Sequence, residues 1–200
     1  MICTEKQKLI AKESCYVSIG ITEDGLPRTA ISIPWEKTAH AFNMKLPDVY
    51  LEPNDLFDDE VMNLLSDFTV IGCYIWASLE SYDFLSNFPS IRDLSIRNAN
   101  ALRTLDFLSY LKECRMMYLH RANLQSLNEI WAANRESRHS PLCGLHCVAL
   151  CQCRVDDLIP PHAGECYFSE FLIWENKEFA NRERWNGVTA ATFRYTECDE

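Results

Sequence analysis

The 200-residue chain carries 19 Lys and Arg against 29 Asp and Glu, a formal net charge of −10, and 48% of its residues are hydrophobic. This composition can fill a core and cover a surface, so it predicts one compact domain. The acidic balance argues against nucleic-acid binding, which needs clustered Lys and Arg. The longest apolar stretch (68–79) is too short to cross a bilayer, and residues 1–14 are polar and unlike a signal peptide. We therefore expect a cytoplasmic protein with neither a nucleic-acid nor a membrane partner.

The N-terminal region predicts a β-hairpin over residues 15–34. Its two arms, CYVSIGI and RTAISI, are rich in β-prone residues, and Glu23, Asp24 and Gly25 between them suit a turn. We expect residues 1–45 to form a cap at one end of the structure.

Residues 46–161 repeat an apolar pattern at a spacing of about 23 residues. A unit of this length cannot bury its apolar face alone, so neighbouring units must stack. The pattern gives five units, and the polar stretch 132–140 predicts a loop inserted before the last. We expect equivalent side chains to share one row, made of Ile71, Leu94, Met117 and Leu145.

Each unit combines two periods. Apolar and polar residues first alternate, as in a half-buried strand, and apolar residues then recur every three or four positions, as on one face of a short helix. The second pattern is clearest at 61–65 and 102–111. Repetition of such a unit predicts an α/β fold with a parallel sheet on one side and helices on the other.

The unit resembles the leucine-rich-repeat family, whose motif reads L-x-x-L-x-L-x-x-N-x-L. LPDVYLEPNDL (46–56) fills every position, and SIRDLSIRNANAL and ECRMMYLHRANL fill it less fully. Of the motif asparagines only Asn54 is kept. The resemblance implies an irregular solenoid with a concave parallel sheet and convex helices.

The β-prone segments CYFSEFLIW and VTAATFRY predict a β-rich C-terminal cap over 162–200.

The concave sheet face is the predicted partner-binding surface, because solenoids bind through such sheets. Its polar and aromatic residues include Tyr and Arg, types enriched where interfaces concentrate their energy. The resulting hypothesis is a protein–protein interaction module without catalytic activity or cofactor, whose partner is another protein. Its partner-binding residues are Tyr50, Glu52, Tyr74, Ser95, Arg97, Tyr118, His120 and His146, with Gly72 and Val148 in the same two columns.

A metal- or redox-active cysteine protein is the alternative. Zinc sites use thiolates at spacings like those of Cys143, Cys147, Cys151 and Cys153. The repeat register favours a strand there, which sends Cys147 into the core and sets His146 on the opposite face, against a Cys–His pair. No nucleotide-binding, hydrolase or zinc-protease fingerprint is present.

Overall fold

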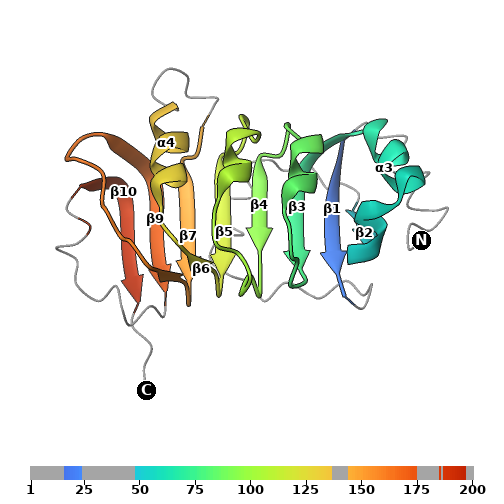
Figure 1. The fold of residues 1–200 in the computed structure, drawn as a ribbon. Coiled ribbons are helices and arrows are strands. Elements are labelled where there is room, and N and C mark those ends of the chain that lie inside the picture. Colours follow the sequence, from blue (N-terminus) through green and yellow to red (C-terminus); the bar gives the residue numbers. More distant parts are fainter. Residues whose placement is uncertain (1–15, 24–47, 137–143, 175–184, 186, 197–200) are drawn as a thin grey trace.

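In the computed structural model, eight strands form one open sheet (Figure 1). The structure describes residues 16–23, 48–136, 144–174, 185 and 187–196. All neighbouring strands pair in parallel, in the order β10-β9-β7-β5-β4-β3-β1-β2. The strands are β1 (Tyr16–Thr22), β2 (Asp48–Leu51), β3 (Thr69–Trp76), β4 (Asp93–Ile96), β5 (Met116–His120), β7 (Cys147–Cys151), β9 (Cys166–Trp174) and β10 (Val188–Thr196). A second, two-stranded sheet pairs β6 (Asn123–Leu124) with β8 (Arg154–Val155). The predicted α/β class with a parallel sheet is confirmed.

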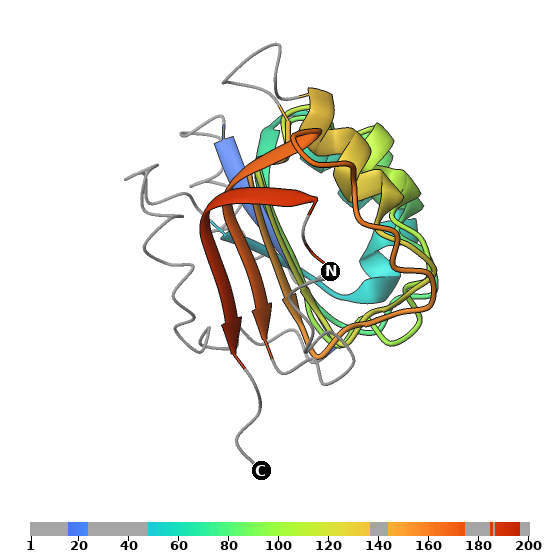
Figure 2. The same ribbon diagram turned by 90° about the vertical axis from the view of Figure 1, so that its left-hand side faces the viewer.

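The described helices all lie on one side of the large sheet (Figure 2). They are the α-helices α3 (Asp59–Ser66) and α4 (Asn128–Glu136) and the 3-10 helices η2 (Pro53–Phe57), η3 (Asp83–Asn87) and η4 (Asp106–Ser109). The Asp58 side chain caps α3 by accepting hydrogen bonds from the backbone N–H groups of Glu60 and Val61. The helix predicted at 61–65 is thus confirmed, whereas the segment 102–111 forms only the short η4.

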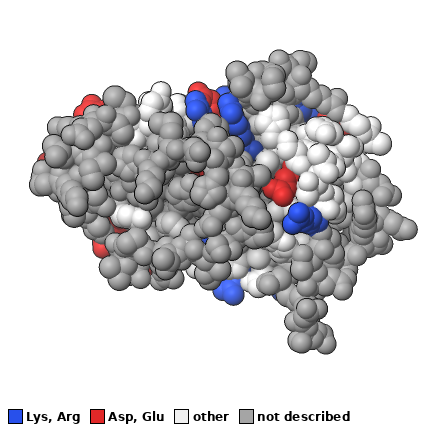
Figure 3. Space-filling view, turned by 180° about the vertical axis from the view of Figure 1, so that it is seen from behind, with Lys and Arg blue, Asp and Glu red and all other residues white. Residues whose placement is uncertain are grey.

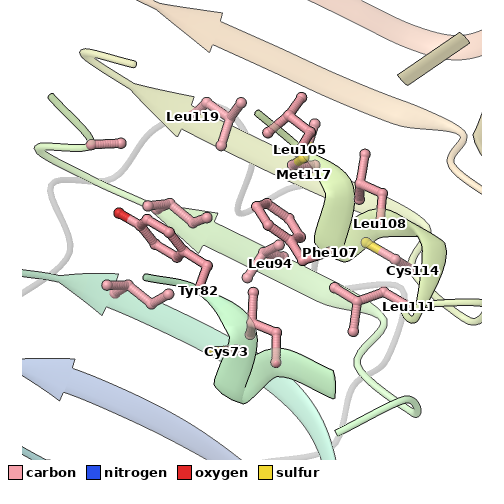
Figure 4. Close-up of a cluster of buried hydrophobic side chains, with 14 of the residues drawn as sticks. Cys73, Tyr82, Leu94, Leu105, Phe107, Leu108, Leu111, Cys114, Met117 and Leu119 are labelled. Carbon is pink, nitrogen blue, oxygen red and sulfur yellow. The ribbon is translucent and has the colours of Figure 1, made fainter. Parts of the chain in front are cut away.

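The core lies between the sheet and these helices. It is built from rows of side chains that cross the sheet, and Figure 4 shows the central part. One row is Val49, Ile19, Cys73, Leu94, Met117, Val148, Phe171 and Phe193. The next is Leu51, Ile21, Ile75, Ile96, Leu119, Leu150 and Ile173.

The predicted row is right at its centre and wrong at both ends. Leu94 pairs with Met117 as expected. Ile71, however, has no partner on β1, where the register of β3 against β1 shifts, and it is Cys73 that lies beside Leu94. On the other side Val148 replaces Leu145. A shift of three residues reverses the faces of the strand, so Val148 is fully buried in the core instead of lying on the opposite face.

The N-terminal hairpin prediction is wrong. β1 has a parallel neighbour on each edge, β2 and β3, which leaves no edge for an antiparallel partner. The predicted second arm, 28–33, lies outside the described residues. β1 also separates the first two predicted units, whose strands β2 and β3 do not pair. The two β-prone C-terminal segments do form strands, β9 and β10, and these extend the same parallel sheet.

The predicted loop at 132–140 is wrong in its first half. Residues up to Glu136 belong to α4, and 137–143 lie outside the described residues. The helix is favoured because it buries Ile130 and Trp131 together with Asn134.

Candidate binding face of the sheet

The face of the sheet opposite the helices, called here the far face, carries most of the predicted partner-binding residues. Four of them, Tyr50, Tyr74, Ser95 and Tyr118, lie in one row, with Gly20 of β1 between the first two. The repeat predicts Tyr50, Ser95 and Tyr118 in one column but puts Gly72 there in place of Tyr74, which is corrected by the pairing of Tyr74 with Ser95. His120 follows on β5, one row nearer the carboxyl ends of the strands. His146 precedes β7 and is not in this row, where Ala149 lies beside Tyr118.

Glycines on the far face make room for aromatic rings. A Cβ added to Gly20 would lie 2.8 Å from the Tyr50 ring and 3.4 Å from that of Trp76. The rings of Tyr74 and Trp76 stack on each other, with centroids 6.0 Å apart. β1, β2 and β3 together therefore present an aromatic surface, and Gly20 is the reason it can be close-packed.

Tyr118 is more buried than the sequence pattern suggests. Only 4% of its surface is exposed, and with Ala149 and Leu172 it forms a second apolar cluster, on the far face. The Arg97 guanidinium carbon lies 5.5 Å from the centre of its ring. Burial raises the pKa of Tyr118 well above its usual value. The Tyr118 ring is thus a buried surface on which the Arg97 guanidinium lies. The half-exposed residues around Tyr118 form the accessible surface.

Among the residues that the structure describes, three buried polar atoms of the far face have no hydrogen-bond partner: Thr22 Oγ1, Trp76 Nε1 and Arg97 Nε. Thr22 pairs with Trp76 across the sheet, and the backbone N–H of Arg97 donates to the carbonyl of Ile75 at 2.8 Å. The three groups therefore lie at the carboxyl ends of neighbouring strands, where open parallel sheets bind their ligands. Each unmet hydrogen bond costs about 1–3 kcal/mol.

Thr22 and Trp76 were not among the predicted residues. The signal at Trp76 was present in the sequence, because a tryptophan occupies the place of the repeat asparagine, but nothing local showed that Thr22 would lie beside it.

Further along this edge, Gln152 links two other polar side chains. The Gln152 side-chain oxygen lies 3.2 Å from His120 Nε2 and accepts a hydrogen bond from Arg121 Nε at 2.8 Å. Glu52, by contrast, caps the start of η2, and its backbone N–H donates to Asp55. Figure 3 views the far-face side, where the described surface beside β9 and β10 is mostly uncharged with isolated acidic and basic groups.

Asp93 also lies on the far face, on β4 two residues before Ser95. It is therefore one row nearer the amino ends of the strands than Tyr74 and Ser95. Burial raises the pKa of its carboxyl to about 6, although the Tyr74 hydroxyl, which donates to Asp93 Oδ2 at 3.2 Å, acts to lower it.

The cysteine alternative gains no support from the geometry. Cys147 and Cys151 alternate with the core residues of β7 and so face away from the core, correcting the prediction for Cys147, whereas Cys153 is in the core. Burial, ahead of the nearby Glu170, raises the pKa of Cys147 to about 11, and burial raises that of Cys153 to about 12. Thiolates, the metal-binding and nucleophilic form, are disfavoured there. Cys143 lies outside the described residues, and within them no three His, Cys, Asp or Glu side chains are placed to hold a metal ion.

No protein-family model, curated protein or solved structure matches the chain. Among the described helices, none has the length and apolarity needed to cross a membrane.

Proposed function

We propose that this protein is a cytoplasmic, non-catalytic binding module of the leucine-rich-repeat type that holds another protein on its far face, at the carboxyl ends of β3, β4 and β5. The observation that carries the proposal is the pair of unpartnered N–H donors at Trp76 Nε1 and Arg97 Nε. Two buried donors at the ends of neighbouring strands are unfavourable without acceptors, and a partner that supplies oxygen atoms to them would gain their hydrogen bonds.

The surroundings of these donors suit a protein partner. Trp76, Arg97 and His120 are half-exposed, and the stacked Tyr74 ring extends the apolar surface beside them. Aromatic residues with one polar atom and arginines supply most of the binding energy in protein interfaces. Backbone carbonyls or carboxylates of a partner segment would complete the hydrogen bonds.

Recurring backbone geometry supports the repeat architecture. Asn98, Arg121 and Gln152 each have a positive φ, between 51° and 60°, and each follows a core residue of its strand by two positions. The same turn therefore ends three consecutive units, as expected for stacked repeats. The raised thiol pKa values of Cys147 and Cys153 favour binding over cysteine chemistry.

The test is to identify a protein captured from a lysate of the source cells and measure its affinity for purified variants. Arg97→Glu and Trp76→Phe should each weaken binding about tenfold or more, because each removes one donor. Lys112→Glu makes the same charge reversal at an exposed position outside the far face and should bind like the wild type. Thermal unfolding should show that all three variants fold.

Equal affinity of the wild type, Arg97→Glu and Trp76→Phe would reject the far face as the binding surface. A wild-type chain that retains no protein would reject the function itself.

A further inference from the structure

The edge formed by the carboxyl ends of β3, β4, β5 and β7 is poor in acidic residues, although the chain as a whole is acidic. The first three residues after each of these four strands include no Asp or Glu. The first residue after β4 is Arg97, and the first after β5 is Arg121. Glu23 and Glu52 follow β1 and β2, which lie two and three strands away from β4. Two arginines thus end neighbouring strands without a carboxylate beside them in the sequence.

Neither arginine forms an ion pair with a residue of the described chain. The ion pairs between described residues use other arginines, namely Arg92, Arg103 and Arg135. A guanidinium without an anionic partner keeps its capacity to bind a carboxylate through two parallel hydrogen bonds.

Arg97 is held in place by a contact that leaves its charge unneutralised. Its guanidinium carbon lies 5.5 Å from the centre of the Tyr118 ring, and the arginine side chain is half-exposed. The buried ring orients the guanidinium but offers it no oxygen acceptor.

Arg121 is oriented by a neutral side chain. Its Nε donates to the Gln152 side-chain oxygen at 2.8 Å, and the same oxygen lies 3.2 Å from Nε2 of His120, a far-face residue. Arg121 itself is exposed. The hydrogen bond uses only Nε, so the two terminal nitrogens have no partner among the described residues and can donate to a ligand.

The charge of the whole protein limits which anion this edge can hold. Ligands with several negative charges, such as nucleic acids, are repelled by the net charge of −10. A single carboxylate is repelled less, and its planar shape matches the guanidinium group.

We propose that the partner held on the far face is a protein segment that presents an acidic side chain here, and that its carboxylate is bound between Arg97 and Arg121. Neighbouring strands lie about 4.8 Å apart, so long side chains from the ends of β4 and β5 can reach one group. This inference rests on the proposed function, because it names the chemical group by which that partner is recognised.

The test is a titration of the ¹⁵N-labelled full-length protein with the peptide acetyl-Gly-Glu-Gly amide, followed by NMR of the arginine Nε–H signals. The signals of Arg97 and Arg121 should shift. Those of Arg103 and Arg135, which are already paired with acids, should stay in place. The neutral peptide acetyl-Gly-Gln-Gly amide should leave all four unchanged.

Variants then separate the site from general charge effects. Arg121→Gln should weaken binding of the Glu peptide about tenfold, because it removes one charged donor group. Arg135→Gln changes the net charge equally, at an arginine of α4 whose side chain is 51% exposed, and should bind like the wild type. Thermal unfolding should show that both variants fold.

The affinity of a captured partner protein distinguishes the two proposals. If the wild type holds a protein on its far face and Arg121→Gln holds it as tightly as Arg135→Gln does, the carboxylate site is overturned while the proposed function stands. If no protein is captured but the Glu peptide shifts both arginine signals, the site is supported and the proposed function fails.

The peptides can also overturn the inference by themselves. Absence of a shift with the Glu peptide, or an equal shift with the Gln peptide, would reject a carboxylate site. Tighter binding of acetyl-Gly-phosphoserine-Gly amide than of the Glu peptide would reject it in favour of a phosphorylated partner.

Discussion

Asn134 and Tyr167 hold each other through a reciprocal pair of hydrogen bonds. The Asn134 amide donates to the Tyr167 carbonyl and its oxygen accepts from the Tyr167 N–H, both at 2.8 Å. The same amide donates to the Leu145 carbonyl at 2.7 Å. One buried side chain of α4 thus fixes the chain just before β7 and the start of β9, which places two strands relative to one helix.

Replacing Asn134 should therefore destabilise the protein strongly. Asn134→Ala leaves two carbonyls and one N–H unpaired, and we expect a loss of about 3 kcal/mol in the free energy of unfolding, measured with urea. Asn63→Ala, an exposed change on α3, is the matched control and should change stability little. Equal stability of the two variants would show that the clamp contributes nothing.

The middle of the core row predicts a contrast between two neighbouring positions. Ile96 is fully buried between Ile75 and Leu119, so Ile96→Asp places an unpaired charge in the core and should unfold the protein. Asn98 has a φ of 56°, a conformation that Asp also tolerates, so Asn98→Asp should change stability little. Circular dichroism spectra of both variants would check this, and a folded Ile96→Asp would contradict the assigned row.

The β-branched variant Asn98→Val tests the same turn differently. A β-branched residue is strained at positive φ, so we expect a loss of about 1–2 kcal/mol in the free energy of unfolding. Thermal unfolding would measure it, and a melting temperature equal to that of Asn98→Asp would argue against the left-handed turn.

Asp93 should make stability depend on pH. Its pKa is about 6 in the folded protein against a usual 3.8, so the folded state holds this proton more tightly than the unfolded state. The associated stability is complete below about pH 4 and is lost as the pH rises through 6. Asp93→Asn should thus be about 2 kcal/mol more stable than the wild type at pH 8, with the advantage vanishing near pH 4.

Urea unfolding at several pH values would check this difference. Asp157→Asn, at an exposed position, is the control and should track the wild type throughout. A constant difference between Asp93→Asn and the wild type across the range would contradict the burial of the charge.

Among the described cysteines, Cys151 should react first with iodoacetamide. Cys151 is half-exposed, whereas Cys147 and Cys153 are buried with raised pKa values. Peptide mass spectrometry after brief labelling at pH 8 would rank the three, and Cys151→Ser should abolish the earliest label among them. Faster labelling of Cys153 than of Cys151 would contradict the burial of the Cys153 thiol.

The sequence predicts the pairing of β4 with β5 at the middle of the sheet correctly. Leu94 and Met117 occupy equivalent places 23 residues apart, and the structure pairs them. Prediction failed at both ends of the row. Ile71 is also 23 residues from Leu94, yet Cys73 pairs with Leu94. On the other side, where the unit is longer, residues 132–136 form part of α4 and Val148 enters the core in place of Leu145. Periodicity gives a strand its two faces but cannot choose between registers when the preceding connection is longer.

In the candidate site, too, the repeat predicts some residues correctly and misses others. Tyr50, Ser95 and Tyr118 share one column of the repeat, and the structure places them in one row. Tyr74 belongs to the other predicted column and enters this row because β3 pairs with β4 two residues away from the repeat register. Thr22 was missed because its position beside Trp76 depends on β1, which no repeat spacing relates to β3. The burial of Tyr118 was missed because alternation marks the side of a sheet a residue occupies and does not reveal what covers that side.

The position of β1 has a consequence for how the protein can be shortened. Arrays of repeats usually tolerate removal of terminal units, since each unit contacts only its neighbours. Here β1, the first described strand in the chain, lies between β2 and β3 in the sheet. Its removal would leave β2 without a neighbouring strand. N-terminal truncation past Thr22 would open the sheet from within, so deletion series should be designed from the C-terminal side.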